Sequence, residues 1–175
     1  MELVTALSLI RDIPDFPTSG ILFRDITPLL ADGEAFNTVT RELARTESDF
    51  SHIVGIEARG FILGAAMAAQ SGVGFIPFRK AGKLPHQTIT RSYGLEYGSD
   101  AIEAHIDALK SGDRVLIVDD VLATGGTLLA AIELVEELGA EIAEIVVLFE
   151  IAALGGRAKI LNRYPDISIR ALVQA

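Results

Sequence analysis

Residues 115–127 read VLIVDDVLATGGT, and this stretch decides what the fold and its site can be. Four apolar residues run directly into two adjacent aspartates, Asp119 and Asp120, and a glycine turn follows. A continuous apolar run of this kind is typical of a strand buried on both faces, as in a parallel sheet. The next residues, GTLLAAIELVEELG, predict a helix with a buried stripe of Leu128, Ile132, Val135 and Leu138.

The turn between this strand and this helix has the features of a phosphate site. Gly125 and Gly126 allow the backbone to approach an anion without a Cβ in the way. Thr124 and Thr127 add hydroxyl donors, and the helix that follows directs its free N–H groups at the same place. Acids at a strand end also serve as caps or turn formers, but the glycine turn directly behind them favours binding of Mg²⁺ or sugar hydroxyls.

The rest of the chain alternates apolar strands with helices. Helices are predicted over 34–48 and in GFILGAAMAAQSG, and strands in SHIVGIEARG, VGFIPFRKAGK, IAEIVVLFE and ISIRALVQ. This alternation predicts an α/β fold with a mainly parallel central sheet flanked by helices. Ligands bind such sheets at the carboxyl ends of the strands, so the charged segments 57–59, 79–83 and 119–120 are expected to converge there.

The segment DAIEAHIDA alternates with period two, which predicts a half-buried strand. The apolar residues fall on one face and the polar residues on the other: Ile102, Ala104 and Ile106 against Glu103, His105 and Asp107. We expect His105 to be exposed and His52 to mark a strand entry, and the three histidines have no metal-ligand spacing.

Composition limits the classes of function. A chain of 175 residues fits a single domain over 1–175 and can bury a substantial core without covalent links. The absence of cysteine excludes disulfides and thiolate metal sites and suits a cytoplasmic location. A net charge of −9 argues against nucleic-acid binding. We expect no signal peptide and no membrane segment, because no apolar run approaches the ~20 residues of a membrane span.

Other phosphate-binding classes fit poorly. The P-loop motif fails because Phe61 and Ile62 stand where Lys and Ser or Thr are required, and no G-x-G-x-x-G opens a helix after a strand. VLIVDD also resembles the first strand of a response-regulator receiver domain. Such a domain needs more than 100 further residues, whereas 55 follow Asp120, and Asp166 does not end an apolar strand.

Five stretches resemble the adenine-using members of the type I phosphoribosyltransferase family in order and spacing: DFPTSGILFRDITPLL, GIEARGFILGAAMA, PFRKAGKLP, SYGLEYG and VLIVDDVLATGGTL. The resemblance covers residues 12–158 and includes GGRAKI. It implies that fold, with a small N-terminal hood over about 1–33 and a mobile lid over about 83–99. It also implies transfer of the phosphoribosyl group of 5-phospho-α-D-ribose 1-diphosphate to adenine, which yields AMP and diphosphate in purine salvage.

The resemblance assigns roles to the sugar-diphosphate site. Ala123, Thr124, Gly125, Gly126 and Thr127 would hold the 5′-phosphate. Asp119 and Asp120 would meet the ribose hydroxyls and assist Mg²⁺, which the substrate itself mainly holds. Arg59 would grip the diphosphate, with Lys83 and, more weakly, Lys80 and Arg79. For a lone arginine or a basic run, a surface ion pair or a solvated face is the ordinary alternative.

The resemblance also assigns the purine site. Phe23 would stack on adenine, Leu22 would offer backbone groups, Arg24 would fix the hood, and Glu96 would act on the base from the lid. The catalytic set is therefore Glu96, Arg59 and Lys83. Two structural features are implied as well: a cis peptide at Glu57–Ala58, and a homodimer with residues 79–85 near the partner's site.

Two rival functions remain in view. A ligand-sensing regulator on the same fold would carry a DNA-binding segment, but the chain is acidic and leaves no room for one before residue 12. An enzyme for 6-oxopurines is the nearer rival. The hood and LEYG favour adenine, although the physical chemistry of the sequence alone does not separate an amino from an oxo purine.

Overall fold

The computed structural model describes residues 1–94 and 100–174. The chain forms two compact units, Met1–Arg45 and Thr46–Ala175. The second unit holds a seven-stranded sheet in the order β5-β6-β4-β3-β7-β8-β9. Its strands are β3 His52–Ile56, β4 Gly74–Lys80, β5 Thr88–Tyr93, β6 Asp100–His105, β7 Arg114–Leu122, β8 Glu141–Glu150 and β9 Ile169–Gln174.

Most neighbouring strands of this sheet are parallel. β3 pairs in parallel with β4 and β7, and β8 pairs in parallel with β7 and β9. β6 is antiparallel to both β4 and β5 and forms an edge hairpin with β5. The prediction of a mainly parallel central sheet is therefore confirmed, with an antiparallel addition at one edge.

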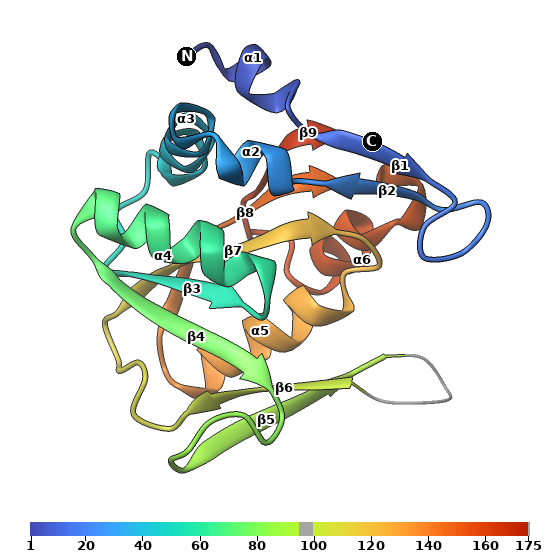
Figure 1. Ribbon diagram of the computed structural model, residues 1–175. Coiled ribbons are helices and arrows are strands. Elements are labelled where there is room, and N and C mark those ends of the chain that lie inside the picture. Colours follow the sequence, from blue (N-terminus) through green and yellow to red (C-terminus); the bar gives the residue numbers. More distant parts are fainter. Residues whose placement is uncertain (95–99, 175) are drawn as a thin grey trace. The chain divides into compact units, whose positions relative to one another are not determined.

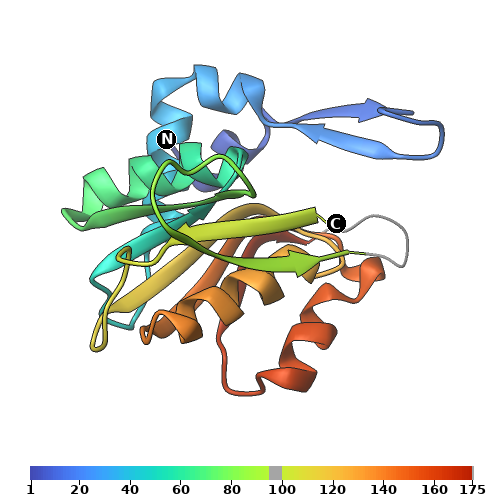
Figure 2. The ribbon, with the colours of Figure 1, turned by 90° about the horizontal axis from the view of Figure 1, so that it is seen from below.

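Helices cover both faces of the sheet. α4 Arg59–Ser71 packs on one face, and α5 Gly126–Glu137 and α6 Gly156–Arg163 lie on the other, as Figures 1 and 2 show. A short 3₁₀ helix, Ala152–Leu154, precedes α6. Three members of the buried stripe predicted for α5, Leu128, Ile132 and Val135, are at most 2% exposed, whereas Leu138 is the C-cap beyond the helix and is half-buried. The flanking helices that the sequence predicts are thus confirmed.

The central strand β7 is buried along its apolar run. Val115, Leu116, Ile117 and Val118 are fully buried, as expected for a strand covered on both faces. The strand does not end at the paired aspartates, however: it continues to Leu122, so both acids lie within it. The pairing of β7 with β8 extends to Leu122 opposite Glu150, which keeps the backbone extended past the acids.

The predicted faces of the 100–107 strand are confirmed at Ile102 and Ala104, which are buried, but are wrong at Glu103, His105 and Ile106. Glu103 is 4% exposed, whereas Ile106, which the pattern placed inside, lies beyond β6 and is 43% exposed. His105 is half-buried rather than exposed. The cause is the chain between β4 and β5, because the backbone N–H groups of Lys83 and Leu84 donate to the Glu103 carboxylate and bury it. Strand β5, inside the expected lid, was also missed.

The N-terminal unit combines a hairpin with three short helices. Its elements are α1 Leu3–Leu7, β1 Arg11–Pro14, β2 Leu22–Asp25, α2 Thr27–Ala31 and α3 Gly33–Ala44. β1 and β2 pair antiparallel around a turn that holds a cis Phe16–Pro17 peptide. α3 ends before the predicted boundary at residue 48. Across the described part of the chain, no helix is both long enough and apolar enough to span a bilayer.

Candidate active site

An arginine from α4 meets the aspartate pair of β7. Arg59, the first residue of α4, places Nη2 2.8 Å from Oδ2 of Asp120. Oδ1 of Asp119 accepts a hydrogen bond of 2.8 Å from the backbone N–H of Asp120. Asp119 is 9% exposed and Asp120 5%. The structure thus brings together three residues that the sequence placed in one site.

Burial is the largest influence on the pKa values of the two acids. It raises the pKa of Asp119 well above its usual value, and the negative charge of Asp120 raises it further. Burial also raises the pKa of Asp120, while the nearby Arg59 guanidinium opposes that rise. The pKa of Asp119 is raised more strongly than that of Asp120, so Asp119 is the more costly of the two to ionise. A ligand that brings hydroxyl donors or a cation would relieve that cost.

Glycines allow α4 to lie directly against this strand. A Cβ on Gly60 would stand 2.8 Å from the carbonyl oxygen of Val118 and 3.2 Å from Oδ1 of Asp119. A Cβ on Gly64 would stand 2.8 Å from Cγ1 of Val118. Real Cβ atoms do not approach so closely, so α4 could not hold Arg59 here with larger residues at these positions. The Glu57–Ala58 peptide that leads into α4 is cis, which confirms the prediction.

The turn after β7 presents backbone donors. Gly125 has φ +78°, in the left-handed region that suits glycine, and it is the N-cap of α5. Gly125 has no side chain with which to cap α5, so the N-cap residue leaves the N–H groups of the first turn to other acceptors, such as an anion. Gly126 and Thr127 lie at that first turn. The turn predicted as a phosphate site therefore leads through a left-handed glycine directly into a helix N-terminus.

The basic segment after β4 is fixed by carboxylates. Arg79 donates to Glu57 through Nε at 3.2 Å and Nη2 at 3.3 Å, and the backbone N–H of Lys80 donates to Glu57 at 3.0 Å. Burial raises the pKa of Glu57, but the Lys80 N–H and the Arg79 guanidinium outweigh it, so the pKa is below the usual value. Arg79 therefore joins the carboxyl end of β4 to Glu57, the residue that follows β3.

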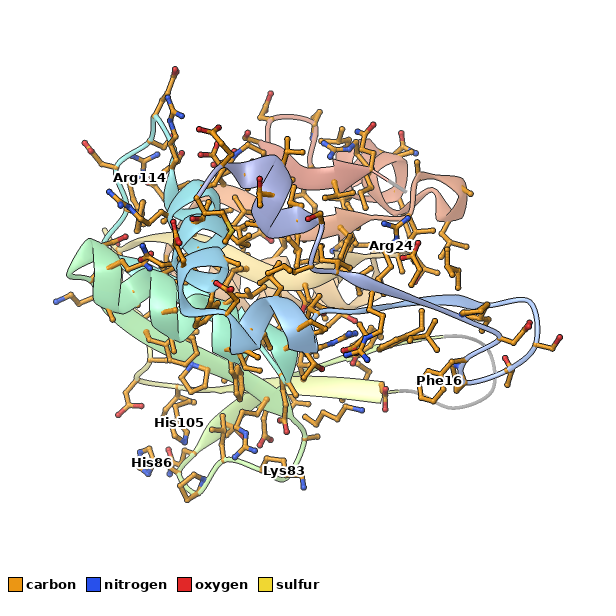
Figure 3. All side chains as sticks on the ribbon, turned by 45° about the horizontal axis from the view of Figure 1, so that its top comes forward. Phe16, Arg24, Lys83, His86, His105 and Arg114 are labelled. Carbon is orange, nitrogen blue, oxygen red and sulfur yellow. The ribbon has the colours of Figure 1, made fainter. Side chains whose placement is uncertain are left out.

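The two lysines of this segment remain on the surface. Lys80 and Lys83 are exposed, and Nζ of Lys80 lies 3.6 Å from a carboxylate oxygen of Asp100. The backbone of Lys83 is held from both sides: its N–H donates to Glu103 at 2.9 Å, and its carbonyl accepts from Arg79 at 3.1 Å. Lys83 is marked in Figure 3.

Sequence reasoning missed Glu103 as a residue of this region. Its carboxylate accepts the N–H groups of Lys83 and Leu84, both at 2.9 Å, and the hydroxyl of Thr88 at 3.4 Å. Burial raises the pKa of Glu103, and these hydrogen bonds more than compensate, so the pKa is lowered. The only available signal was an acid in a strand directly after a glycine-bounded segment. Such a pattern does not show which groups the side chain of the acid contacts.

The predicted purine residues belong to the N-terminal unit. Leu22, Phe23 and Arg24 are consecutive in β2. The Phe23 ring meets Phe16 edge-on, with centroids 5.2 Å apart, and Nε of Arg24 lies 4.0 Å from Asp12 on β1. Figure 3 marks Phe16 and Arg24 on this hairpin. Glu96, the predicted lid residue, lies outside the described residues.

The histidines stand apart from the acid pair in sequence and in contacts. His52 begins β3, as predicted. The rings of His86 and His105 meet edge-on at 6.0 Å (Figure 3). Over residues 1–94 and 100–174, no group of three or more His, Asp or Glu side chains is arranged to hold a metal.

Comparisons with known proteins agree with this geometry. A family model described as phosphoribosyl transferase domain matches residues 30–170. The adenine phosphoribosyltransferase of Streptomyces coelicolor is 56% identical over 169 residues, which cover 95% of this chain and 93% of that protein. The crystal structure of adenine phosphoribosyltransferase from Thermoanaerobacter pseudethanolicus has a TM-score of 0.91 at 46% identity, covering 99% of this chain and 100% of that one.

A ligand complex is also similar. The Giardia lamblia adenine phosphoribosyltransferase bound to 9-deazaadenine has a TM-score of 0.90 at 42% identity, covering 100% of this chain and 98% of that one. These likenesses span both units of the chain, and they include the N-terminal residues that precede the match to the family model.

Substitution Glu103→Gln tests the carboxylate under the basic segment. We expect the free energy of unfolding to fall by about 1 kcal/mol or more at pH 7, because two charge-assisted hydrogen bonds become neutral. Since the native pKa is lowered, the stabilisation is present above the ordinary value of 4.5 and is lost as pH falls through the native pKa. Urea unfolding at pH 7 and pH 4 should therefore show the difference shrinking in acid.

Glu141→Gln is the matched control. Glu141 begins β8, its side chain is 74% exposed, and its ion pair with Arg114 is 3.7 Å long. Loss of that pair should change the stability by less than about 0.5 kcal/mol at either pH. Equal changes in the free energy of unfolding for the two substitutions would show that the charge of Glu103 does not stabilise the fold.

Proposed function

Because this chain belongs to the phosphoribosyl transferase domain family, we propose that it transfers the 5-phosphoribosyl group of 5-phospho-α-D-ribose 1-diphosphate to adenine. The products are AMP and diphosphate, and the step is one of purine salvage. The observation that carries the proposal is the buried Asp119–Asp120 pair followed directly by an uncapped glycine turn. Relatives of 50% identity and more that bear the adenine name support the choice of base.

Charge development explains the roles of the residues. Breaking the bond between ribose C1 and diphosphate leaves a cationic sugar and an anionic leaving group. The 123–127 turn holds the 5′-phosphate through its N–H groups. Asp119 and Asp120 accept hydrogen bonds from the ribose hydroxyls and lie near the positive charge that develops on the ribose. These hydrogen bonds stabilise the ionised form of both acids, which burial disfavours in the free protein.

Arg59 and Lys83 stabilise the leaving diphosphate. A guanidinium has five N–H donors, so Arg59 can keep its 2.8 Å contact with Asp120 and also bind a diphosphate oxygen. Lys83 supplies a mobile point charge from a backbone that Glu103 and Arg79 fix. Lys80 adds a weaker contribution. Arg79 acts mainly through Glu57, which it binds with two N–H groups, rather than on the substrate.

The donor set fits magnesium held mainly by the substrate. Mg²⁺ prefers octahedral oxygen ligands and commonly uses one or two carboxylates together with substrate phosphates. Asp119 and Asp120 offer two adjacent carboxylates, and Arg59 already occupies one oxygen of Asp120. That is too few for a site made of protein alone, and it suits assistance to a substrate-bound ion. When bound, Mg²⁺ supplies positive charge to the diphosphate.

The purine site is proposed from the N-terminal hairpin and the lid. Phe23 would stack on adenine, Leu22 would offer its backbone groups, and Arg24 would fix the hairpin through its ion pair with Asp12. Glu96 would hydrogen-bond the N7 side of the base while N9 attacks the sugar. A single domain with a hood at about 1–33, a closing lid at about 83–99 and a homodimer follow from the same resemblance, and the absence of cysteine suits a cytoplasmic location.

An assay of four bases tests the proposed function. With Mg²⁺ and the sugar diphosphate, the protein should convert adenine to AMP and give little turnover with hypoxanthine, guanine or xanthine. Excess chelator should abolish turnover, since the leaving diphosphate would then lack its cation. Light scattering on the same sample should give the mass of a dimer. Equal or faster turnover of hypoxanthine would overturn the assignment of the base.

Glu96→Gln tests the proposed lid residue. The substitution keeps the size and removes the charge, so kcat with adenine should fall by at least about tenfold, with a smaller effect on the KM for the sugar diphosphate. The control is Glu141→Gln, which removes the charge of an exposed glutamate and should leave kcat unchanged. The nearer Glu103 is unsuitable for this purpose because it is buried. Full kcat in Glu96→Gln would show that this glutamate takes no part in the reaction.

A further inference from the structure

The proposed phosphate turn rests on a glycine from a distant part of the chain. A Cβ on Gly156, the first residue of α6, would stand 2.2 Å from the carbonyl oxygen of Ala123 and 2.8 Å from the backbone nitrogen of Gly125. A Cβ on Gly125 would in turn stand 2.8 Å from the carbonyl oxygen of Gly156. The two backbones are therefore in direct contact, and neither position accepts a larger residue without moving the turn.

The residue that follows Gly156 is anchored by a buried carboxylate. Arg157 donates to Glu150 from Nε at 2.9 and 3.1 Å and from Nη2 at 2.6 Å. Nη1 of Arg157 donates to the carbonyl oxygen of Ile169 at 2.7 Å, so the guanidinium also binds the backbone of β9. Glu150 is 4% exposed. Such a forked, charge-assisted contact fixes the direction of the arginine as well as its distance.

Glu150 is itself fixed by the sheet. It is the last residue of β8, opposite Leu122 of β7 and Gln174 of β9. The next residue, Ile151, donates its N–H to the carbonyl oxygen of Leu122 at 2.9 Å. Leu122 directly precedes the phosphate turn. The Glu150–Arg157 pair therefore ties the start of α6 to the same strand end from which the turn begins.

We propose that Gly156, Arg157 and Glu150 are positioning residues for the phosphate turn, which they hold in the conformation that presents its N–H groups to a 5′-phosphate. The inference rests on the proposed function, since it takes the 123–127 turn as the phosphate site. None of the three needs to touch the substrate. Gly156 supports the turn by backbone contact, and the Glu150–Arg157 pair keeps Gly156 in place.

The same helix provides a natural comparison. Arg163, at the end of α6, also forms an ion pair with a carboxylate, that of Glu133 on α5. Its side chain is 58% exposed, whereas that of Arg157 is 31% exposed and its partner only 6%. An exposed pair contributes little to rigidity, so Arg163 should be dispensable for the turn while Arg157 is not.

Binding of ribose 5-phosphate by titration calorimetry, together with steady-state kinetics, tests the proposal. Gly156→Ala should raise the Kd for ribose 5-phosphate by at least about tenfold, which corresponds to about 1.4 kcal/mol. Arg157→Lys keeps the charge and loses the fork, and it should raise the Kd by about three- to tenfold. Glu150→Gln should do the same. The KM for the sugar diphosphate should rise in parallel, while the KM for adenine stays within about twofold.

Arg163→Lys is the control and should leave every constant within about twofold of the unsubstituted protein. Circular dichroism melting identifies variants that fold, and if Gly156→Ala does not fold, Arg157→Lys decides the outcome. An unchanged Kd in folded Arg157→Lys and Glu150→Gln would overturn the proposal while leaving the proposed function intact. So would a lower kcat with unchanged KM, which indicates only loss of folded protein. Failure of the unsubstituted protein to bind ribose 5-phosphate would overturn the proposed function itself.

Discussion

The site depends on two places where another backbone approaches β7 and its turn more closely than a Cβ would permit. Gly60 brings the first turn of α4 against Val118 and Asp119, and Gly156 brings the start of α6 against Ala123. The first contact sets Arg59 beside the acids. The second supports the turn that follows them. Because α4 and α6 cover opposite faces of the sheet, the strand end is fixed from both sides (Figure 2).

The buried acids of this region fall into two groups according to the direction of their pKa shifts. Three buried or half-buried glutamates, Glu57, Glu103 and Glu150, accept hydrogen bonds from arginines or backbone N–H groups, and their pKa values are lowered. The paired aspartates share the charge of Arg59, but burial outweighs it and their pKa values are raised. The net charge of −9 therefore includes buried carboxylates of two kinds, those with lowered and those with raised pKa values.

Local sequence signals were sufficient for the parts of the site that are local. The apolar run before Asp119 and the periodicity after Gly126 predicted strand, turn and helix, because each depends on neighbours within a few residues. The contact between Gly156 and Ala123 joins residues far apart in the chain, so no local pattern could indicate it. The burial of Glu103 was mispredicted for the same reason. Period two gives the alternation of the two faces of the strand, but the backbone N–H groups of Lys83 and Leu84 cover the face that carries Glu103.

The division among the acids has a consequence for how the site works. A carboxylate with a lowered pKa already has its donors, so its contribution is to hold a loop in one conformation. Glu57 and Glu103 do this for the segment after β4, and Glu150 does it for the start of α6. Burial raises the pKa of a carboxylate because it disfavours the charged form, and a ligand that supplies further donors or a cation stabilises the ionised form. The fold therefore stabilises the ionised form of the glutamates that shape the strand ends, whereas burial and the neighbouring Asp120 raise the pKa of Asp119, so a cation or further hydrogen-bond donors would favour its ionised form.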